Sequence, residues 1–389
     1  MDLSWLGRQL EIEGEFISAV TYGSGHINET FAATYEMHGA EKGAQPHRCR
    51  FIHQRINVNV FKDPATLMKN LARVTRHIRG KLEVRGEEDV ERRVLKLIAT
   101  RDGVDWVIDE GGNYWRTFSF IEGATTFDVV ETVNQAHEVG RAFGEFQHQL
   151  VDLGPPQLAF TIPDFHNTPE RLRAFRQAIE RDVCNRAAAV RDEIRRVDHY
   201  VDLVDGLLEL QRAGDLPLRV VHNDTKINNV LIDDDTGEGL CVIDLDTVMP
   251  GLAADDFGDL VRTSSSFARE DDRDLSKAVI ELPIFEALAT GYLSASASFL
   301  SDSEIDSLII GSKLMAYEQA LRFLADHLAG DTYFRIHRKA HNLDRARVQI
   351  ALLDSIVAHE DEMRSIIERA VEESQGNDVL SGAREKYRG

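Results

Sequence analysis

The chain has 389 residues, with 66 acidic and 45 basic side chains and a formal net charge of −21. This charge argues against nucleic acid or an anionic membrane as a partner, since both need a positive surface. No apolar run approaches the roughly 20 residues of a membrane helix, and the first residues lack the pattern of a signal peptide. Three widely separated cysteines favour a reducing, cytoplasmic location over a disulfide framework or a zinc site.

The first third of the chain predicts an antiparallel sheet. Runs rich in aromatic and β-branched residues favour strands at residues 16–20, 30–35, 50–56, 106–116 and 118–121. The run at 106–116 is typical of a hairpin, because Gly111-Gly112 is a common turn pair. One helix interrupts the strands, from Asp63-Pro64 to about Gly80, where apolar residues recur at helical spacing.

The rest of the chain is predicted to be mostly helical. The connector Glu122-Gly123 is the expected boundary between a domain of residues 1–122 and one of residues 123–389. An apolar stripe predicts a helix from Val133 to Leu150, and Gly140 and Gly144 within it suggest close helix packing. Two helices are expected between residues 168 and 212, and others at about 270–295, 303–329 and 343–374, followed by fifteen polar, frayed residues.

Polar residues gather around a predicted hairpin between Val220 and Asp246. They are His222, Asp224, Lys226 and Asn229 after its first strand, and Asp244 at the end of its last strand. Phosphoryl transfer on the protein-kinase plan needs such a set. One carboxylate orients an attacking hydroxyl and accepts its proton, while an amide oxygen and a second carboxylate hold magnesium against the nucleotide phosphates. Lys226 can reach charge that develops on the transferred group.

Each of these residues also has an ordinary structural interpretation. A His-x-Asp after a strand is often a turn, and Asn228-Asn229 is a common turn pair. Two glycines between Tyr22 and Asn28 can let backbone N–H groups approach phosphate oxygens, although by themselves they are typical of any hairpin. The joint pattern nevertheless favours a kinase site. In so acidic a chain, that site must be made positive locally by magnesium, backbone N–H groups and a few basic side chains.

The chain resembles the aminoglycoside phosphotransferase and choline kinase superfamily, and within it the N-acetylhexosamine 1-kinases most closely. The resemblance covers nearly the whole chain and is most specific at YGSGHIN (22–28), FHNTP (165–169), HNDTK (222–226), IDLDTVMPG (243–251), DFGD (256–259) and RFLAD (322–326). It implies an α+β, two-lobed, protein-kinase-like fold. The N-lobe would be small and β-rich, the C-lobe large and mostly helical with the catalytic hairpin, and ATP would lie between them.

The resemblance also implies roles for individual residues. Those expected to contact ATP are Gly23, Ser24, Gly25, Gln54, Phe120 and Glu122. Asp224 and Lys226 are expected to act in catalysis, and Asn229 and Asp244 to bind magnesium. His26 and Arg322, together with Asp224, are expected to contact the sugar. The implied reaction moves the γ-phosphoryl group of ATP to the anomeric hydroxyl of N-acetylglucosamine or N-acetylgalactosamine. Only the family likeness favours position 1 of the sugar over position 6.

The chain departs from the broad kinase pattern at the third strand. Many kinases carry a lysine there that pairs with a helix glutamate, but Gln54 aligns with that lysine and the following helix has no glutamate. Gln54 or Arg55 could meet the phosphates instead, although a solvent-facing role is more typical of Arg55. Similarly, His26 could be an ordinary turn residue, and Arg322 could form an exposed ion pair with Asp326, four residues on.

Other functions are weighed on specific residues. The segment Asp255–Asp259 matches the Asp-Asp-x-x-Asp of terpenoid synthases, but those enzymes place it in a long helix of an all-helical fold. We instead interpret Asp256 as the kinase-fold aspartate that braces the catalytic loop through backbone hydrogen bonds. The acceptor could be another small hydroxylated compound of the aminoglycoside, choline or homoserine type. A pseudokinase that binds nucleotide or sugar without turnover is disfavoured, because a pure binder has no need of a base such as Asp224.

Overall fold

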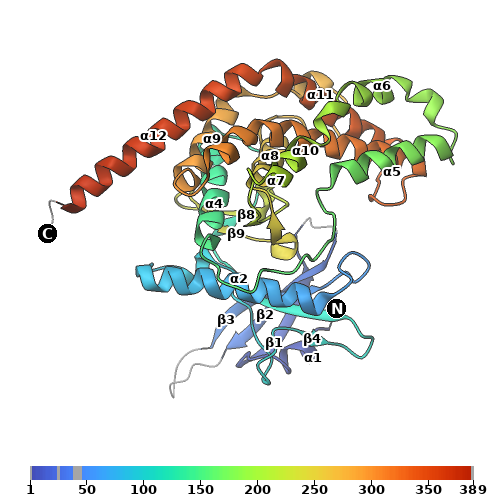
Figure 1. Ribbon diagram of the computed structural model, residues 1–389. Helices are drawn as coiled ribbons and strands as arrows, with labels where there is room; N and C mark the ends of the chain where they lie inside the picture. Colours follow the sequence, from blue (N-terminus) through green and yellow to red (C-terminus); the bar gives the residue numbers. More distant parts are fainter. Residues whose placement is uncertain (1, 24–26, 38–45, 387–389) are drawn as a thin grey trace. The chain divides into compact units, whose positions relative to one another are not determined.

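The computed structural model describes residues 2–23, 27–37 and 46–386, with side chains up to residue 376 (Figure 1). The chain divides into two compact units. Unit 1 consists of Met1–Ala124, Asp152–Ile162 and Cys241–Met249, and unit 2 of Thr125–Val151, Pro163–Leu240 and Pro250–Gly389. The predicted boundary after Glu122 stays a prediction. Unit 1 includes two segments from much later in the chain, and a single boundary in the sequence cannot predict them.

Unit 1 is built on a five-stranded antiparallel sheet in the order β1-β2-β3-β5-β4. The strands are β1 (Gly14–Thr21), β2 (Glu29–Met37), β3 (His47–Arg55), β4 (Val107–Ile108) and β5 (Tyr114–Ser119). The predicted sheet is therefore confirmed, and so is its hairpin turn, where Gly112 has a φ of 78°. The register sets Gln54 opposite Thr30 on one neighbouring strand and Arg116 on the other.

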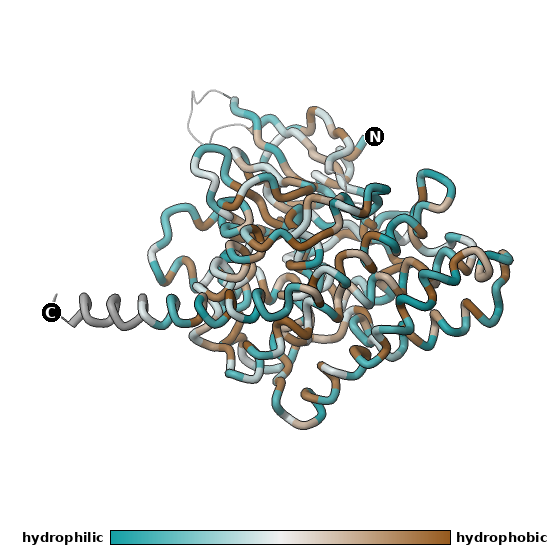
Figure 2. The backbone as a smooth tube through the Cα atoms, turned by 90° about the horizontal axis from the view of Figure 1, so that it is seen from above, coloured by the Kyte–Doolittle hydropathy of each residue, from teal (hydrophilic) through white to brown (hydrophobic). Residues whose placement is uncertain are grey.

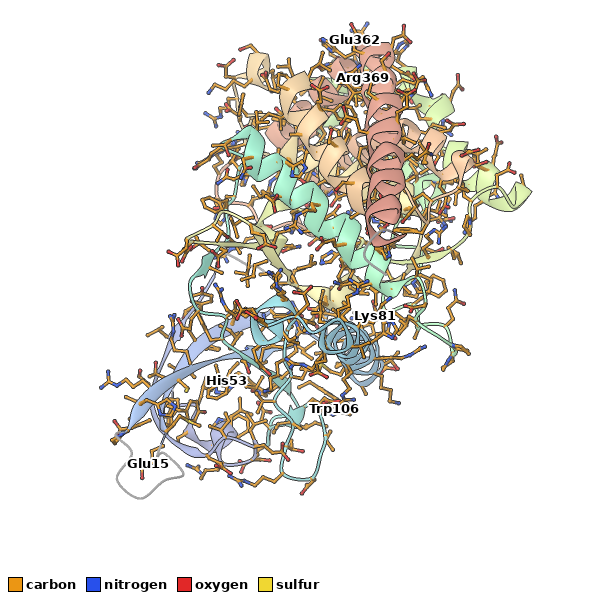
Figure 3. The ribbon with its side chains drawn as sticks, turned by 90° about the vertical axis from the view of Figure 1, so that its left-hand side faces the viewer. Glu15, His53, Lys81, Trp106, Glu362 and Arg369 are labelled. Atoms are coloured by element: carbon orange, nitrogen blue, oxygen red, sulfur yellow. The ribbon has the colours of Figure 1, made fainter. Side chains whose placement is uncertain are left out.

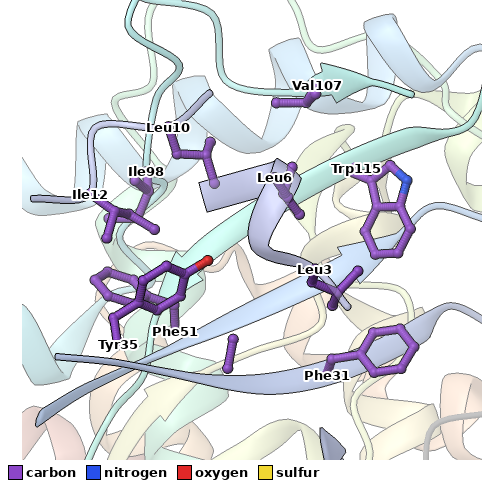
Figure 4. Close-up of a cluster of buried hydrophobic side chains, with 11 residues drawn as sticks. Leu3, Leu6, Leu10, Ile12, Phe31, Tyr35, Phe51, Ile98, Val107 and Trp115 are labelled. Atoms are coloured by element: carbon purple, nitrogen blue, oxygen red, sulfur yellow. The ribbon is translucent and has the colours of Figure 1, made fainter. Parts of the chain in front are cut away.

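The core of unit 1 includes an N-terminal helix that the sequence did not indicate. Helix α1 (Ser4–Gly7) is only four residues long, yet it brings Leu3 and Leu6 against Phe31 and Trp115 of the sheet (Figure 4). His53 of β3 is also buried (Figure 3) and contacts the Tyr35 hydroxyl at 3.0 Å. Burial lowers the pKa of His53 to about 4, so this histidine is neutral.

The predicted helix after Asp63 is longer than expected. Helix α2 (Pro64–Arg85) begins where the Asp63 carboxylate accepts the Thr66 N–H at 3.0 Å, and it ends at Gly86, whose φ is 75°. Gly80 does not end it, because glycine lowers helix stability without preventing helix formation. The remaining short elements of unit 1 are α3 (Val90–Arg93) and the 3₁₀ turn η4 (Leu245–Thr247).

Unit 2 is mostly helical, as predicted, and hydrophobic and hydrophilic positions alternate along its helices (Figure 2). The helices are α4 (Val133–Leu150), α5 (Thr168–Arg181), α6 (Arg191–His199), α7 (Gly206–Ala213), α8 (Ala253–Ser264), α9 (Leu282–Ser296), α10 (Asp302–Ala329), α11 (His341–Ala358) and α12 (Glu360–Lys386). Its 3₁₀ turns are η1 (Ala187–Ala189), η2 (Val201–Leu203), η3 (Ile227–Asn229) and η5 (Leu275–Lys277). Within the described residues, no helix combines the length and apolarity needed to cross a membrane.

Two small sheets accompany these helices. One pairs β7 (Arg219–Val221) with β10 (Met249–Gly251), and the other has the order β6 (Ala124–Thr125), β8 (Val230–Asp233), β9 (Gly239–Val242). The chain passes between the units within β6, β9 and β10. The hairpin predicted between Val230 and Ile243 is confirmed as β8 and β9, and its turn is closed by Gly237, whose N–H donates to the Asp233 carbonyl at 2.9 Å.

Four helix predictions for unit 2 need correction. The two helices expected between residues 168 and 212 are three, α5, α6 and α7. Helix α8 was not expected, because its acidic residues interrupt the apolar pattern, although they are buried and bonded in the fold. The helix expected from residue 270 begins only at Leu282, with Pro283 in its first turn. The helix expected over 343–374 is two helices that separate at His359, and the second extends to Lys386 through residues expected to fray.

The predicted close packing of α4 is confirmed. A Cβ added to Gly140 would collide with the Leu288 carbonyl oxygen, and one added to Gly144 would collide with that of Tyr292. The two glycines therefore let the backbone of α4 meet the backbone of α9 directly.

We expect Gly144→Ala to lower the free energy of unfolding by about 1–3 kcal/mol, because the added methyl group must push the two helices apart. Gly80→Ala in α2 is the matched control. No atom lies within 4 Å of its added Cβ, so that variant should gain about 0.5–1 kcal/mol from helix propensity. Denaturant unfolding measures both, and equal stability of the two variants would contradict the packing interpretation.

Candidate functional site

The loop after β7 is held by one buried carboxylate. The backbone N–H groups of His222 and Asn223 donate to the two oxygens of Asp256 at 2.8 and 2.6 Å. The Thr225 hydroxyl donates to the Asp256 carbonyl at 2.5 Å, and the Gln147 amide donates to its carboxylate at 2.7 Å. The prediction that Asp256 braces this loop through backbone hydrogen bonds is confirmed.

The loop also holds a strained backbone position. Asn223 has a φ of 65°, in the left-handed region that non-glycine residues rarely adopt. Beside it, the buried His222 ring packs edge-on against Phe143 and Phe146, with ring centroids 5.4 and 5.8 Å apart. Strain of this kind persists only where the surroundings over-determine the conformation, and such positions often mark functional sites.

Asp224, Lys226 and Asn229 meet at the end of this loop. Lys226 Nζ lies 2.9 Å from an Asp224 carboxylate oxygen. The Asn229 amide donates to the Asp224 carbonyl at 2.8 Å and to the same carboxylate at 3.1 Å. Lys226 and Asn229 together hold the Asp224 side chain in place, although it is still 29% exposed. The sequence therefore named three residues that the structure brings together.

The charges around Asp224 favour its ionised form. Burial would by itself raise the pKa of this carboxyl, but the attraction of Lys226, with smaller contributions from His222 and Arg262, lowers it below the ordinary value. Asp224 is therefore a carboxylate at neutral pH, with two fixed partners and an accessible edge that can accept a proton from a bound hydroxyl group.

The residues proposed for magnesium have suitable chemistry. Asn229 makes its two bonds through its amide nitrogen, so its carbonyl oxygen is the atom it can offer to a hard cation. Among the described residues, no group of three or more His, Cys, Asp or Glu side chains could hold a metal ion. Asp244 lies in unit 1, with a φ of 57°, so a metal shared with Asn229 stays a prediction.

His166, two residues before α5 and largely buried, connects the loop to Glu318 of α10. His166 lies 3.2 Å from a Glu318 carboxylate oxygen through Nδ1 and 3.3 Å from the Asn223 carbonyl through Nε2. The other Glu318 oxygen accepts the Thr168 hydroxyl at 2.9 Å. Because both ring nitrogens face acceptors, both must carry hydrogens. Burial by itself would lower the pKa of His166, but Glu318 outweighs it and raises that pKa to about 9.

Arg322, one turn after Glu318 on α10, does not form the ion pair with Asp326 that we had considered. Its guanidinium donates to Gln319 at 2.9 Å and lies 5.5 Å from the Phe334 ring centroid. The buried Asp326 instead accepts the backbone N–H groups of residues 332, 333 and 334. It thereby fixes the loop that brings Phe334 over Arg322.

Some of the predicted nucleotide-binding residues of unit 1 lie among the described residues and some do not. Gly23 is described and has a φ of 80°, with no atom within 4 Å of an added Cβ. Ser24, Gly25 and His26 lie outside the described residues. The exposed Glu122 accepts from Arg50 at 2.8 Å.

The ring of Phe120 joins these connector and turn residues. The Arg50 guanidinium, which donates to Glu122, also lies 3.7 Å from the Phe120 ring centroid. Tyr22, beside Gly23, contacts Phe120 edge-on at 5.3 Å. The start of the glycine turn and the connector therefore lie together in unit 1.

Gln54, which aligns with the third-strand lysine of other kinases, is bound on both sides. Its amide donates to the Thr30 hydroxyl at 2.9 Å, and its carbonyl accepts from Arg116 Nε at 2.9 Å. Arg116 also forms a buried ion pair with Asp246, two residues after Asp244. Arg55, the other candidate for this role, is half-exposed and pairs with Glu29.

Comparison with known families agrees with this geometry. The model of the phosphotransferase enzyme family matches residues 67–290, more than half of the chain. The chain belongs to this family. Three solved structures have similar folds. An aminoglycoside phosphotransferase from Alicyclobacillus acidocaldarius is 12% identical over 96% of this chain and 94% of its own, with a TM-score of 0.53, and an amicoumacin kinase is 14% identical over 86% of this chain and 87% of its own, with a TM-score of 0.54. A choline kinase from Cryptosporidium parvum is 15% identical over 91% of each chain, with a TM-score of 0.50. The predicted α+β, kinase-like fold is thus confirmed.

The phosphotransferase differs from the terpenoid synthase alternative in its fold. Asp255, Asp256 and Asp259 do lie in a helix, α8. However, unit 1 is an antiparallel sheet, and Asp256 is fully engaged with the catalytic loop. The all-helical alternative is therefore wrong.

Sequence reasoning missed a buried ion pair in unit 1, between Arg116 and Asp246. Arg116 had no assigned role, and Asp246 appeared only within a motif. The two lie 130 residues apart, and a buried arginine inside a strand has no local sequence signature. Only the pairing of β3 with β5 reveals that Arg116 stands beside Gln54.

We expect the stability of this phosphotransferase to fall as pH rises above neutrality. The pKa of His166 is raised from 6.5 to about 9 by Glu318, with Asp255 and Asp259 also facing it. Protonated His166 therefore stabilises the fold fully below pH 6.5, and this contribution, on the order of 3 kcal/mol, is lost as pH rises through about 9. Denaturant unfolding between pH 7.5 and 9.5 measures it.

Glu318→Gln is the control for this pH dependence, because it removes the charge that holds the proton on His166. The range above pH 7.5 is chosen because burial raises the pKa of Asp255 to about 7, and its titration also lowers stability up to that pH. An equal slope for wild type and Glu318→Gln would contradict the assignment.

Proposed function

We propose that this phosphotransferase transfers the γ-phosphoryl group of ATP to the anomeric hydroxyl of an N-acetylhexosamine, N-acetylglucosamine or N-acetylgalactosamine. The observation that carries the proposal is the ionised Asp224 carboxylate, fixed by Lys226 and Asn229 on a loop that Asp256 braces. Such a carboxylate suits an alcohol acceptor, since it can orient a hydroxyl and take its proton. The sugar class is supported by the six motifs that resemble N-acetylhexosamine 1-kinases.

In this proposal the residues of the loop divide the work. Asp224 accepts the proton from the sugar hydroxyl as its oxygen bonds to the γ-phosphorus and the bond from that phosphorus to the β-phosphate oxygen breaks. Lys226, 2.9 Å from Asp224, offers a positive charge beside the oxygens on which negative charge accumulates. Asp256 keeps the loop rigid, so that the carboxylate needs no rearrangement when substrate binds.

ATP and Mg²⁺ are the proposed co-substrate and cofactor. Support comes from solved relatives: the amicoumacin kinase structure contains AMP-PNP and Ca²⁺, and a spectinomycin phosphotransferase structure contains ADP. Gly23, Gln54, Phe120 and Glu122 remain our proposed nucleotide contacts, together with Ser24 and Gly25. The Asn229 oxygen and the Asp244 carboxylate would hold Mg²⁺, which, when bound, neutralises charge on the phosphates.

The charge of the acceptor region favours a neutral sugar over a cationic acceptor. Arg171 of α5 and Arg322 of α10 stand close enough that, after burial itself, the Arg322 charge lowers the pKa of Arg171. Two acids, Glu318 and Asp164, also act on Arg171, and Glu318 is already engaged by His166 and Thr168. Two guanidinium groups repel choline or an aminoglycoside, whereas they can donate hydrogen bonds to the hydroxyl and acetamido oxygens of an N-acetylhexosamine. Arg322 and His26 remain our proposed sugar contacts.

Phosphorus NMR of a reaction containing the protein, ATP, Mg²⁺ and N-acetylglucosamine tests the proposal. We expect a sugar 1-phosphate signal and an equivalent amount of ADP, with N-acetylgalactosamine, choline and an aminoglycoside tested in parallel. A 6-phosphate product, or phosphorylation of choline or the aminoglycoside alone, would contradict the proposed acceptor. Nucleotide binding without transfer to any acceptor would instead indicate a pseudokinase.

We expect Asp224→Asn to lower kcat by roughly 10²–10⁴-fold, the usual contribution of a positioned base, while nucleotide binding remains. Asp234→Asn in the exposed turn of the hairpin is the matched control and should keep the wild-type rate. A coupled assay of ADP release measures both variants. Near-normal turnover of Asp224→Asn would remove this residue from the role of base.

We expect Asp244→Ala to abolish the part of nucleotide binding that depends on Mg²⁺, because a carboxylate ligand is lost. Isothermal titration of ADP with and without Mg²⁺ measures this effect. An unchanged dependence on Mg²⁺ would mean that the metal assignment is wrong.

A further inference from the structure

A buried ion pair links two separate segments of unit 1, Met1–Ala124 and Cys241–Met249. Arg116 Nη1, from the middle of β5, pairs with an Asp246 carboxylate oxygen, and the two side chains are only 1% and 4% exposed. Charges buried to this degree are costly unless they are paired and hydrogen-bonded. The pair therefore fixes the segment from Cys241 to Met249 firmly against the sheet.

The second oxygen of Asp246 is used as well. It accepts the Asn28 side-chain amide at 2.6 Å, and Asn28 directly precedes β2. The other end of the Asn28 amide accepts the backbone N–H of Asn57 at 3.0 Å, so this side chain is itself held in place. Thr161 adds a bond to the Asp246 carbonyl at 3.2 Å.

The arginine is oriented by its neighbour on the sheet. Its Nε donates to the Gln54 carbonyl at 2.9 Å, and the Gln54 amide donates to Thr30 at 2.9 Å. Gln54 thus occupies the position of the usual third-strand lysine but acts as an acceptor for a cation from the adjacent strand. The positive charge of this part of the sheet comes from β5 rather than from β3.

We propose that the Arg116–Asp246 ion pair positions Asp244 for the metal-bound nucleotide, and so replaces the lysine–glutamate pair that many kinases build from the third strand and the following helix. Asp244 stands two residues before Asp246, at the start of η4, with a φ of 57°. This left-handed conformation is uncommon for residues other than glycine, and the chain two residues on is held in place, because Asp246 is bound by Arg116, Asn28 and Thr161. Arg116 is a positioning residue, because it acts through Asp246. This inference rests on the metal role proposed for Asp244.

The test measures the affinity for ADP as a function of Mg²⁺ concentration, by isothermal titration and without an acceptor. Arg116→Met should weaken binding of ADP with Mg²⁺ by about 10–100-fold, the usual effect of losing a residue that orients a metal ligand. Binding of ADP without Mg²⁺ should change little, and more Mg²⁺ should be needed for half-maximal binding. Arg116→Lys, which keeps the charge, should recover part of the loss.

Two further variants separate positioning from folding. Arg79→Met removes another arginine ion pair of unit 1, with Glu91 at 2.9 Å, and should leave the Mg²⁺ dependence unchanged. Arg116→Met combined with Asp246→Leu leaves no unpaired buried charge, so it should fold even if Arg116→Met does not. It should still lose the enhancement of ADP binding by Mg²⁺.

The outcomes are distinct from those that test the proposed acceptor. A folded Arg116→Met or double variant with wild-type Mg²⁺ dependence would overturn the positioning role. A wild-type protein whose ADP binding ignores Mg²⁺ would overturn the metal role of Asp244 and this inference with it. A wild type that binds ADP with Mg²⁺ but phosphorylates no sugar would contradict the proposed acceptor only.

Discussion

The loop that carries Asp224 depends on the hydrogen bonds that the Asp256 carboxylate accepts from two backbone N–H groups. His222 and Asn223 bring those groups into the interior, where an unpaired donor would cost about 1–3 kcal/mol. The loop could otherwise satisfy them only by turning outward. With Asp256 in place, Asn223 keeps its left-handed backbone, and Asp224 is presented at the surface of the loop. The helix that carries Asp256 is thus as important to the site as the residues that would touch substrate.

The chain has a net charge of −21, yet basic side chains lie close to the acidic residues discussed here. In unit 2, Lys226 and the buried Arg262 lower the pKa of Asp224, and Arg262 is itself held by Asp259 at 2.7 Å. In unit 1, Arg116 is the buried cation of the sheet. Each of these cations is paired with an acidic side chain, so its charge acts mainly on groups that lie close to it. The net charge of the chain therefore says little about the charge of its site.

How well the sequence predicted each feature depended on how far apart in the chain its partners lie. Asp224, Lys226 and Asn229 fall within six residues, so a spacing pattern was enough to bring them together. Asp256 lies farther along, but its family motif identified it.

The features that were missed depend on long-range pairing. Arg116 stands beside Gln54 only because β3 and β5 pair. Its partner Asp246 lies 130 residues farther along the chain, and no local pattern in the sequence connects the two. For Asp326, spacing suggested an ion pair with Arg322, whereas the carboxylate is buried by a loop that folds back over the helix. Helix α8 escaped prediction for a related reason: its acidic residues look solvent-exposed until their partners are known.

The direct contact of α4 with α9 reaches as far as the loop of Asp224. Gly144 sets the spacing of these helices at Tyr292, whose hydroxyl donates to Gln147 at 2.8 Å, and Gln147 in turn donates to Asp256. Three side chains therefore connect the helix interface to the backbone beside Asp224. A substitution that loosens or tightens this interface would act on the packing of the two helices and on the shape of that loop together.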